Sequence, residues 1–158
     1  MLVRRGFVKG DGKKSHVSDQ THPPRVSDLE MLRQVTTALT DRVAATLAEH
    51  ELTVDQWNVL RSLTVSGPQS MSDLVERTRI TGPTLSRVVD KLAERALVYR
   101  NVDAGDRRRV LVHAADRGHK LVTQIAPLID EVERHGLASL SASEVSTLRT
   151  LLARVASA

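Results

Sequence analysis

The chain has 158 residues, a formal net charge of +4 and 41% hydrophobic residues, but only 2% aromatic residues and no cysteine. This length fits one domain, or one domain with an added dimerisation element. The scarcity of aromatic residues predicts a core of Leu, Val, Ile and Ala, which suits packed helices. The lack of cysteine excludes disulfides, thiolate zinc sites and thiol redox switches, and no segment reaches the ~20 apolar residues of a membrane span. We therefore expect a cytoplasmic protein.

Positive charge is concentrated in two segments. Residues 1–25 hold six Lys and Arg against two Asp, and residues 70–109 hold nine Lys and Arg against six Asp and Glu. Such a distribution of positive charge is expected of a surface that faces phosphates. The alternative interpretation is an ordinary solvated surface, which net charge alone does not distinguish from it. Residues 1–24 combine several Gly, Pro and charged residues with almost no periodicity. We interpret them as a flexible arm.

Capping signatures and apolar spacing predict six helices. In the first, second and last of them, Ser or Thr stands three residues before Glu or Gln, which is the capping-box pattern. Leu, Val and Ile then recur at helical spacing after each start. The predicted first residues or caps are Ser27, Thr53, Ser70, Thr81, Asp116 and Ser141.

The fourth predicted helix, over residues 81–95, has two chemically different faces. Its inward stripe is apolar, from Leu85 to Leu92, whereas its outward side carries small hydroxyl residues, an Arg and a Lys. Arg can bind guanine edges through two hydrogen bonds, hydroxyls can reach bases or phosphates, and Lys can neutralise a phosphate. The outward residues are Thr84, Arg87 and Lys91, flanked by Pro83, Ser86 and Asp90.

Two strand-like segments, 97–102 and 110–113, follow this helix and enclose a basic turn. The turn contains Gly105, which permits a positive φ, and then three successive arginines, which suit the narrow and negative minor groove of DNA. We expect Asp106 to hold Arg108 extended through an ion pair. The alternative is a solvated basic turn without a partner.

Helix, turn, helix and hairpin over residues 70–115 make a winged helix-turn-helix, a layout that places one helix in a DNA major groove. We therefore predict a mainly α fold with a small β-hairpin wing. The terminal helices, residues 25–50 and 116–158, have long apolar stripes that this small lobe cannot cover, and a second subunit would cover them. Two-fold pairing would also match half-sites about 34–36 Å apart on a pseudo-palindromic operator.

Together, these features resemble the MarR family of bacterial transcription regulators, over residues 27–158. The resemblance rests on Leu52-Thr53-Val54-Asp55-Gln56-Trp57, on Thr84 to Leu92, on Ala96 to Arg100, and on the Asp-Arg-Arg wing signature within Asp103 to Arg108. It implies a homodimer that represses a nearby operon and is released by a small, often aromatic or anionic, ligand. It assigns DNA contact to Thr81 to Lys91 and to the wing pair Asp106 and Arg108.

The sequence departs from the family at two places. Ala96 stands where the family usually has Gly, which would cost on the order of 1 kcal/mol if the position needs a positive φ. Ala114-Ala115 replaces the usual Leu-Thr before the fifth helix, so the helix cap should move to Asp116. Neither departure removes a DNA-contacting group.

The residues do not favour an enzyme. None of the six His forms a metal-ligand pattern, and no phosphate loop or nucleophile elbow is present, so we expect no cofactor and no metal. A winged helix that only binds proteins is the stronger rival, but such modules tend to show apolar or acidic residues where this chain has Thr84, Arg87 and Lys91.

The complete set of predicted site residues has two parts. The candidates for binding double-stranded DNA are Ser70, Thr81, Pro83, Thr84, Ser86, Arg87, Lys91, Asp106, Arg107, Arg108 and Arg109. The candidates for an effector ligand, which rest on the resemblance alone, are His50, Trp57 and Arg61. For these the simpler interpretation is that Trp57 packs in the core and that His50 ends the first helix.

Overall fold

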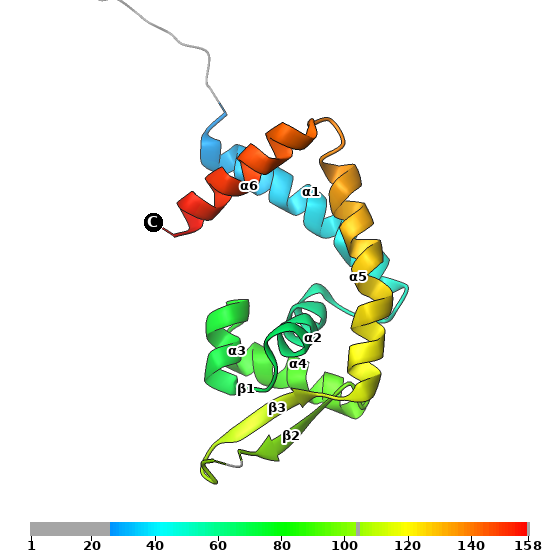
Figure 1. The fold of residues 1–158 in the computed structure, drawn as a ribbon, viewed down its shortest axis with the longest axis vertical. Coiled ribbons are helices and arrows are strands. Elements are labelled where there is room, and N and C mark those ends of the chain that lie inside the picture. Colours follow the sequence, from blue (N-terminus) through cyan, green and yellow to red (C-terminus); the bar gives the residue numbers. More distant parts are fainter. Residues whose placement is uncertain (1–25, 104, 158) are drawn as a thin grey trace, which may run out of the picture.

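The computed structural model describes residues 26–103 and 105–157, so the predicted arm over residues 1–24 lies outside the described residues. The described part holds six α-helices and a three-stranded antiparallel sheet (Figure 1), which confirms the expected mainly helical fold with a small wing. The elements are α1 Asp28–Ala48, α2 Val54–Ser66, β1 Gln69–Ser70, α3 Met71–Thr78, α4 Gly82–Glu94, β2 Val98–Val102, β3 Val110–Ala114, α5 Asp116–Gly136 and α6 Ala142–Ala156.

Side-chain caps fix most of the helix starts. Thr53, Ser70 and Ser141 each form a full capping box, with the hydroxyl accepting from the third backbone N–H and the third side chain accepting from the cap N–H. Ser27 forms only half of the expected box. Its hydroxyl accepts from the Glu30 N–H at 3.1 Å, but the Glu30 carboxylate accepts hydrogen bonds from Arg33 and Gln34 instead.

The predicted cap of α5 was wrong by one residue. Ala115 is the N-cap, without a side-chain hydrogen bond, and Asp116 is the first helical residue. The reason is a long-range hydrogen bond, because the Ala115 N–H donates to the Leu97 carbonyl at 2.9 Å and holds residue 115 extended. The helix therefore begins immediately after that contact, and the Asp116 carboxylate lies in its first turn.

The wing contains one strand more than the predicted hairpin. The strand order is β1-β3-β2, with β2 paired to β3 from Val98↔Ala114 to Val102↔Val110, and β1 added through Gln69↔Val112. The Gln69 side chain is buried and bonded to Ser62 and to the Gly67 carbonyl. β1 therefore attaches the start of α3 to the base of the wing.

One continuous core lies inside the lobe formed by α2, α3, α4 and the sheet, and it extends along α5. It consists of aliphatic side chains and Trp57, which is only 2% exposed. Gly118 is required at one close approach, because a Cβ there would lie 2.3 Å from the Leu97 carbonyl oxygen. The buried core residues are Leu47, Leu52, Trp57, Val59, Leu60, Leu63, Leu74, Ile80, Leu85, Val88, Val89, Leu92, Leu97, Val98, Val112, Ile125 and Ile129.

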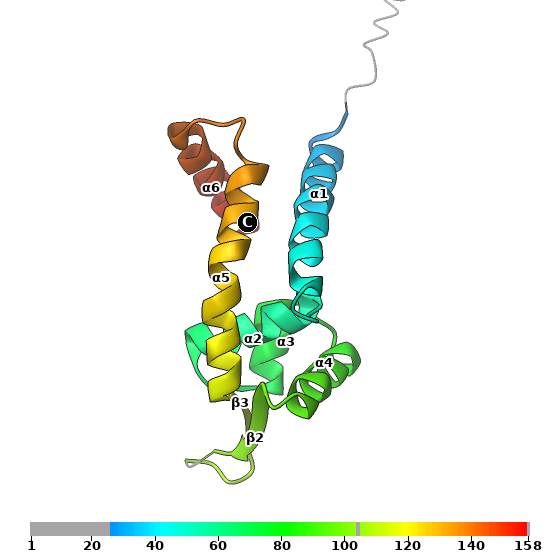
Figure 2. The same cartoon turned by 90° about the vertical axis from the view of Figure 1, so that its right-hand side faces the viewer.

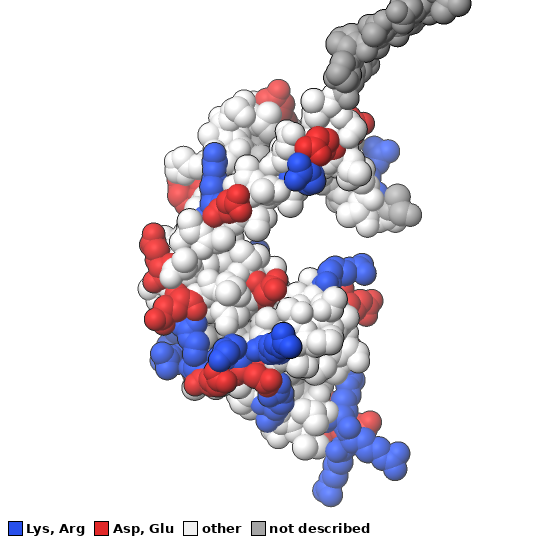
Figure 3. Space-filling model, turned by 180° about the vertical axis from the view of Figure 1, so that it is seen from behind, with Lys and Arg blue, Asp and Glu red and all other residues white. Residues whose placement is uncertain are grey.

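The long helices extend away from this lobe. α5 rises from the sheet with α1 alongside it, and α6 turns back from the far end of α5 (Figures 1 and 2). No residue of α6 is buried, and an open concavity separates its end from the lobe (Figure 3). Large apolar side chains of these helices are exposed, namely Leu29, Met31, Leu32, Val35, Leu128, Leu151, Leu152 and Val155.

The backbone of Ala96 supports the first testable prediction. Its φ is +55°, and a residue with a Cβ pays roughly 1–2 kcal/mol for the left-handed conformation. Ala96→Gly should therefore raise the free energy of unfolding by about 1 kcal/mol, measured by urea denaturation. The matched control is Ala93→Gly inside α4, which should lower it by about 1 kcal/mol or more. Equal destabilisation by both variants would contradict the prediction.

Candidate nucleic-acid interface

The recognition-helix candidate, α4, separates its apolar and polar residues onto opposite faces, as predicted. Leu85, Val88, Val89 and Leu92 are buried, whereas Pro83, Thr84, Ser86, Arg87 and Lys91 are exposed. Thr81 is the N-cap but makes no side-chain cap bond, and its hydroxyl donates to the Thr84 hydroxyl at 3.1 Å. The first turn of α4 thus presents two hydroxyls and Pro83 on its outer surface.

The charges on this exposed face are not equivalent. Lys91 pairs with Glu94 of the same helix at 3.0 Å, and Asp90 pairs with Arg100 of β2 at 2.8 Å. Arg87 has no carboxylate within 4.0 Å among the described residues. The negative charge of Asp90 is therefore compensated within the protein, and the Arg87 guanidinium remains available to an external acceptor.

The tip of the wing is closed by short-range hydrogen bonds. The Asp103 carboxylate accepts from the Gly105 N–H at 2.7 Å, and the Asp103 N–H donates to the Arg109 carbonyl at 2.8 Å. Gly105 does not adopt the positive φ that a glycine permits. Its Asx-type bond to Asp103 closes the turn without that conformation.

The expected ion pair between Asp106 and Arg108 is also absent. The Asp106 carboxylate accepts from the Arg108 backbone N–H at 3.0 Å, which orders the turn. The side chains of Arg107 and Arg108 are exposed, and neither has a carboxylate within 4.0 Å in the described part of the chain. Lys and Arg side chains accordingly project from the wing end of the molecule (Figure 3, lower right).

Arg109, the third wing arginine, is paired with a carboxylate of the protein itself, although its side chain remains 49% exposed. Its guanidinium donates to the Asp73 carboxylate at 2.7 Å and lies 3.5 Å from the Ser70 hydroxyl. Asp73 itself accepts from the Ser70 hydroxyl at 2.6 Å and from the Ser70 N–H at 2.9 Å. The Ser70 hydrogen bonds, followed by the charge of Arg109, hold the pKa of the Asp73 carboxyl below its usual value. This cluster joins the wing to the first turn of α3.

Sequence reasoning missed the roles of Asp73 and Arg100. Asp73 stands three residues after Ser70, so the capping pattern was a local signal that could have identified it. Nothing local indicated Arg100, because its partner Asp90 lies on a different element, ten residues earlier.

Two of the three effector candidates share a cavity. Trp57 and Arg61 of α2 line a cavity of about 350 Å³ together with residues of α1, α5 and α6, including Glu133 and Arg149. His50 does not line it, and its backbone carbonyl accepts from Arg95 at 3.2 Å instead. Trp57 is also a buried core residue, which agrees with the simpler interpretation, while its role in ligand binding stays a prediction.

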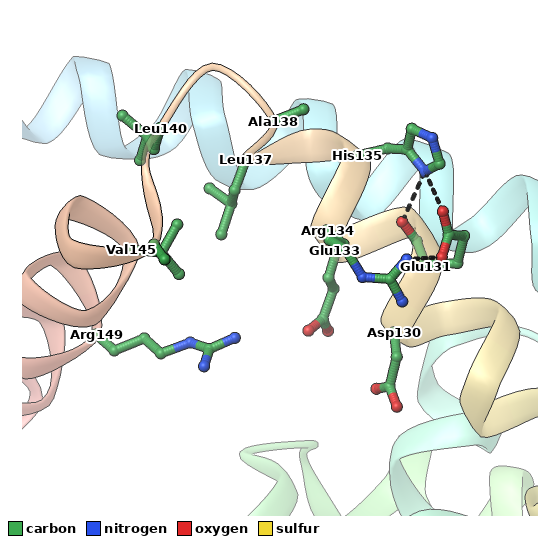
Figure 4. Close-up of a pocket in the computed structure, with 11 residues that line it drawn as sticks. Asp130, Glu131, Glu133, Arg134, His135, Leu137, Ala138, Leu140, Val145 and Arg149 are labelled. Carbon is green, nitrogen blue, oxygen red and sulfur yellow. Dashed lines mark hydrogen bonds and ion pairs between the residues drawn. The ribbon is translucent and has the colours of Figure 1, made fainter.

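A larger cavity of about 620 Å³ lies beside the first, between the end of α5 and the start of α6 (Figure 4). Arg149 from α6 and Glu133 from α5 extend into the same open space, and both also line the cavity beside Trp57. Glu131, by contrast, is bound by Arg134 and His135 of its own helix. The two cavities therefore adjoin each other through shared charged residues.

Neither a metal site nor a membrane helix is found in the described segments. No group of three or more His, Asp or Glu there is placed to hold a metal ion. None of the helices in residues 26–103 and 105–157 is both long and apolar enough to cross a membrane.

Comparison with known proteins identifies the family. Residues 50–109 match the MarR family, and a stretch of 105 residues is 30% identical to the HTH-type transcriptional repressor NicR of Pseudomonas putida, covering 66% of each chain. The chain belongs to the MarR family. It is therefore a DNA-binding transcription regulator and not an enzyme. The stretch that matches NicR spans just under two thirds of the length of NicR.

Solved structures agree with this assignment. BpsR of Bordetella bronchiseptica, whose DNA binding is regulated by 6-hydroxynicotinic acid, has a TM-score of 0.77 at 27% identity, covering 84% of this chain and 94% of BpsR. The MepR–DNA complex of Staphylococcus aureus has a TM-score of 0.73 at 26% identity, covering 84% of this chain and 98% of MepR. The MarR-like fold thus includes the lobe and the long helices.

The Asp73 cluster gives a pH-dependent prediction. Because its pKa is lowered in the folded protein, ionised Asp73 stabilises the fold above its unfolded pKa, and this stabilisation is lost as the pH falls through the folded pKa. Asp73→Asn should lower the urea midpoint at pH 7, and the difference from wild type should shrink as the pH falls towards about 3. The control is Glu76→Gln on the same helix. A pH-independent difference for Asp73→Asn would contradict the prediction.

Proposed function

We propose that this MarR-family regulator is a homodimeric repressor that binds a pseudo-palindromic operator, with α4 in the major groove and residues 103–109 at the minor groove. The observation that carries the proposal is the distribution of free and paired charges. Arg87, Arg107 and Arg108 are exposed and have no carboxylate partner among the described residues, whereas Asp73 and Asp90 are neutralised by Arg109 and Arg100. A surface whose cations are unpaired and whose nearby anions are compensated favours binding to the phosphate backbone of DNA.

The candidate residues divide into three groups under this proposal. Thr81, Pro83, Thr84, Ser86 and Arg87 occupy the exposed first two turns of α4, where a helix in a groove meets base edges. Lys91, Arg107 and Arg108 supply charge for phosphates. Ser70, Asp106 and Arg109 act indirectly, because their contacts hold α3 and the wing in place.

The proposal pairs two copies of the chain through their exposed apolar surfaces. α6 buries none of its residues within one chain, and Leu151, Leu152 and Val155 lie exposed along it. Large exposed apolar patches mark interaction sites, and a two-fold dimer would place two α4 helices on one duplex. A regulator of this kind acts in the cytoplasm, with its DNA.

The same proposal includes a small aromatic or anionic ligand that releases the repressor from its operator. The cavity beside Trp57 combines an aromatic wall with Arg61 and Arg149, which can bind a carboxylate. The regulation of BpsR by 6-hydroxynicotinic acid supports an aromatic acid as the ligand class.

DNA titration tests the interface. Arg87→Ala should weaken binding to the gene's own upstream region by about 1–3 kcal/mol per bidentate base contact and reduce discrimination against mutated sites. Arg108→Ala should weaken binding to all sequences and reduce the salt slope by about 1, because one phosphate is no longer neutralised. Fluorescence anisotropy at several salt concentrations, with and without 6-hydroxynicotinic acid, measures both effects.

Lysine substitutions provide the matched controls. Arg87→Lys keeps the charge but removes the planar fork, so the salt slope should persist while base discrimination falls. Arg108→Lys should keep most of the affinity. Wild-type binding by both alanine variants would refute the contact assignment and favour the protein-interaction alternative.

The dimer is tested separately. Leu152→Glu places a charge in the exposed apolar stripe of α6 and should shift the protein from dimer to monomer in light scattering, because an interfacial charge without a partner is costly. Thr150→Glu, on the opposite side of α6 by helical spacing, is the control and should remain dimeric. A wild-type protein that is monomeric at micromolar concentration would contradict the prediction.

A further inference from the structure

A separate small cavity of about 220 Å³ lies where the end of α4 meets the start of α5, and three cations line it. It shares no lining residue with the cavities beside Trp57 and α6. No Asp or Glu of the described residues lines it, although acidic side chains lie on the same side of the molecule (Figure 3, lower left). The lining residues of this α4–α5 pocket are Arg95, Leu97, Arg117, Lys120, Leu121 and Gln124.

Arg95 is fixed in position before any ligand binds. As the C-cap of α4, it donates through its guanidinium to the backbone carbonyls of Glu51 and His50. The Glu51 carboxylate lies 3.5 Å away but is largely exposed, whereas the Arg95 side chain is 27% exposed. Carbonyl acceptors orient the guanidinium without neutralising its charge, so Arg95 is a preorganised cation.

The other two cations come from α5, and their placement relative to Arg95 is constrained. Gly118 allows the first turn of α5 to pack directly against the Leu97 carbonyl. Arg117 and Lys120 flank that contact, and neither has a carboxylate within 4.0 Å among the described residues. The fold thus gathers three positive charges, two of them without a counterion in the described part of the chain, around apolar walls formed by Leu97 and Leu121.

Three like charges that line one pocket repel one another. A bound anion would relieve this repulsion, and arginine forks match the geometry of phosphate and carboxylate oxygens. The volume is below the roughly 300–1,000 Å³ of pockets for drug-sized ligands. We propose that the α4–α5 pocket binds a compact oxoanion of charge near −2, a phosphate group or a pair of carboxylates, as an effector site distinct from the cavity beside Trp57.

The backbone of operator DNA is the competing source of phosphate, and the geometry disfavours it. Arg95 lies 12 residues after Pro83, which at 1.5 Å per residue is about 18 Å along the helix axis from the turn proposed to meet bases. α5 runs away from the wing end of the lobe (Figure 1), so Lys120 and Gln124 lie progressively farther from it. An anion here would instead bridge α4, α5 and, through Arg95, the turn between α1 and α2.

Calorimetric titration of the full chain with pyrophosphate and with inorganic phosphate, at about 0.15 M NaCl, tests the site. We expect one saturable site per subunit for pyrophosphate, and at least ten-fold weaker binding for Arg117→Ala and for Lys120→Ala. Lys120→Arg should retain binding, as should Arg107→Ala, which removes one exposed charge from the wing. Both Arg117 and Lys120 are exposed, and thermal unfolding checks that the variants fold. No saturable binding by wild type, or an equal weakening in Arg107→Ala, overturns the proposal.

DNA titration of Arg117→Ala and Lys120→Ala without pyrophosphate separates the two sources of phosphate. Unchanged affinity and salt slope are expected for an effector site. A reduced salt slope in both variants means that these cations contact DNA phosphates and overturns the proposal. Because pyrophosphate binding is measured without DNA, failure of the operator assay would count against the proposed function and not against this site.

Discussion

The close approach of α5 to Leu97 is the constraint on which the rest of the structure depends. The Leu97 carbonyl accepts from the Ala115 N–H, and Gly118 passes the same carbonyl at a distance that excludes any side chain. Leu97 is buried directly after α4, so one residue joins the recognition helix, the wing and the first turn of α5. Because close-packed interiors transmit strain, a displacement of α5 would also displace Leu97 and the elements that it joins.

The arginines of the lobe fall into two classes that follow from this packing. Arg95, Arg100 and Arg109 are each bound to another element, whereas Arg87 and the first two wing arginines have no carboxylate partner in the described segments. Exposed ion pairs contribute roughly 0–1 kcal/mol each, so the bound arginines add little to global stability. Their contribution is geometric, because they fix the wing and the α1–α2 turn relative to α3 and α4 and keep acidic groups from opposing DNA.

The sequence predicted the features whose causes are local. The capping boxes predicted at Thr53 and Ser141 and the cap predicted at Ser70 depend on residues three apart, and they are confirmed. The amphipathic pattern of α4 depends on helical spacing and is also confirmed, whereas the box predicted at Ser27 formed only in half. β1 was missed because a two-residue strand exists only through its pairing with β3, at Gln69↔Val112 and Ser70↔Leu111, far away in the sequence. The cap of α5 was misplaced for the same reason, since the Leu97 carbonyl determines it.

The predicted site shows the same division between local and long-range causes. Exposure of Thr84 and Arg87 follows from the helical pattern and could be anticipated, whereas the capture of Arg109 by Asp73 joins residues 36 positions apart. Three successive wing arginines look equivalent in the sequence, yet one is paired with Asp73 and two have no carboxylate within 4.0 Å in the described part of the chain. Which cation stays available to an external phosphate is therefore decided by which carboxylate the fold brings within reach. The positive φ at Ala96 also has a long-range cause. The turn between α4 and β2 must place Leu97, and the chain retains a strained residue there.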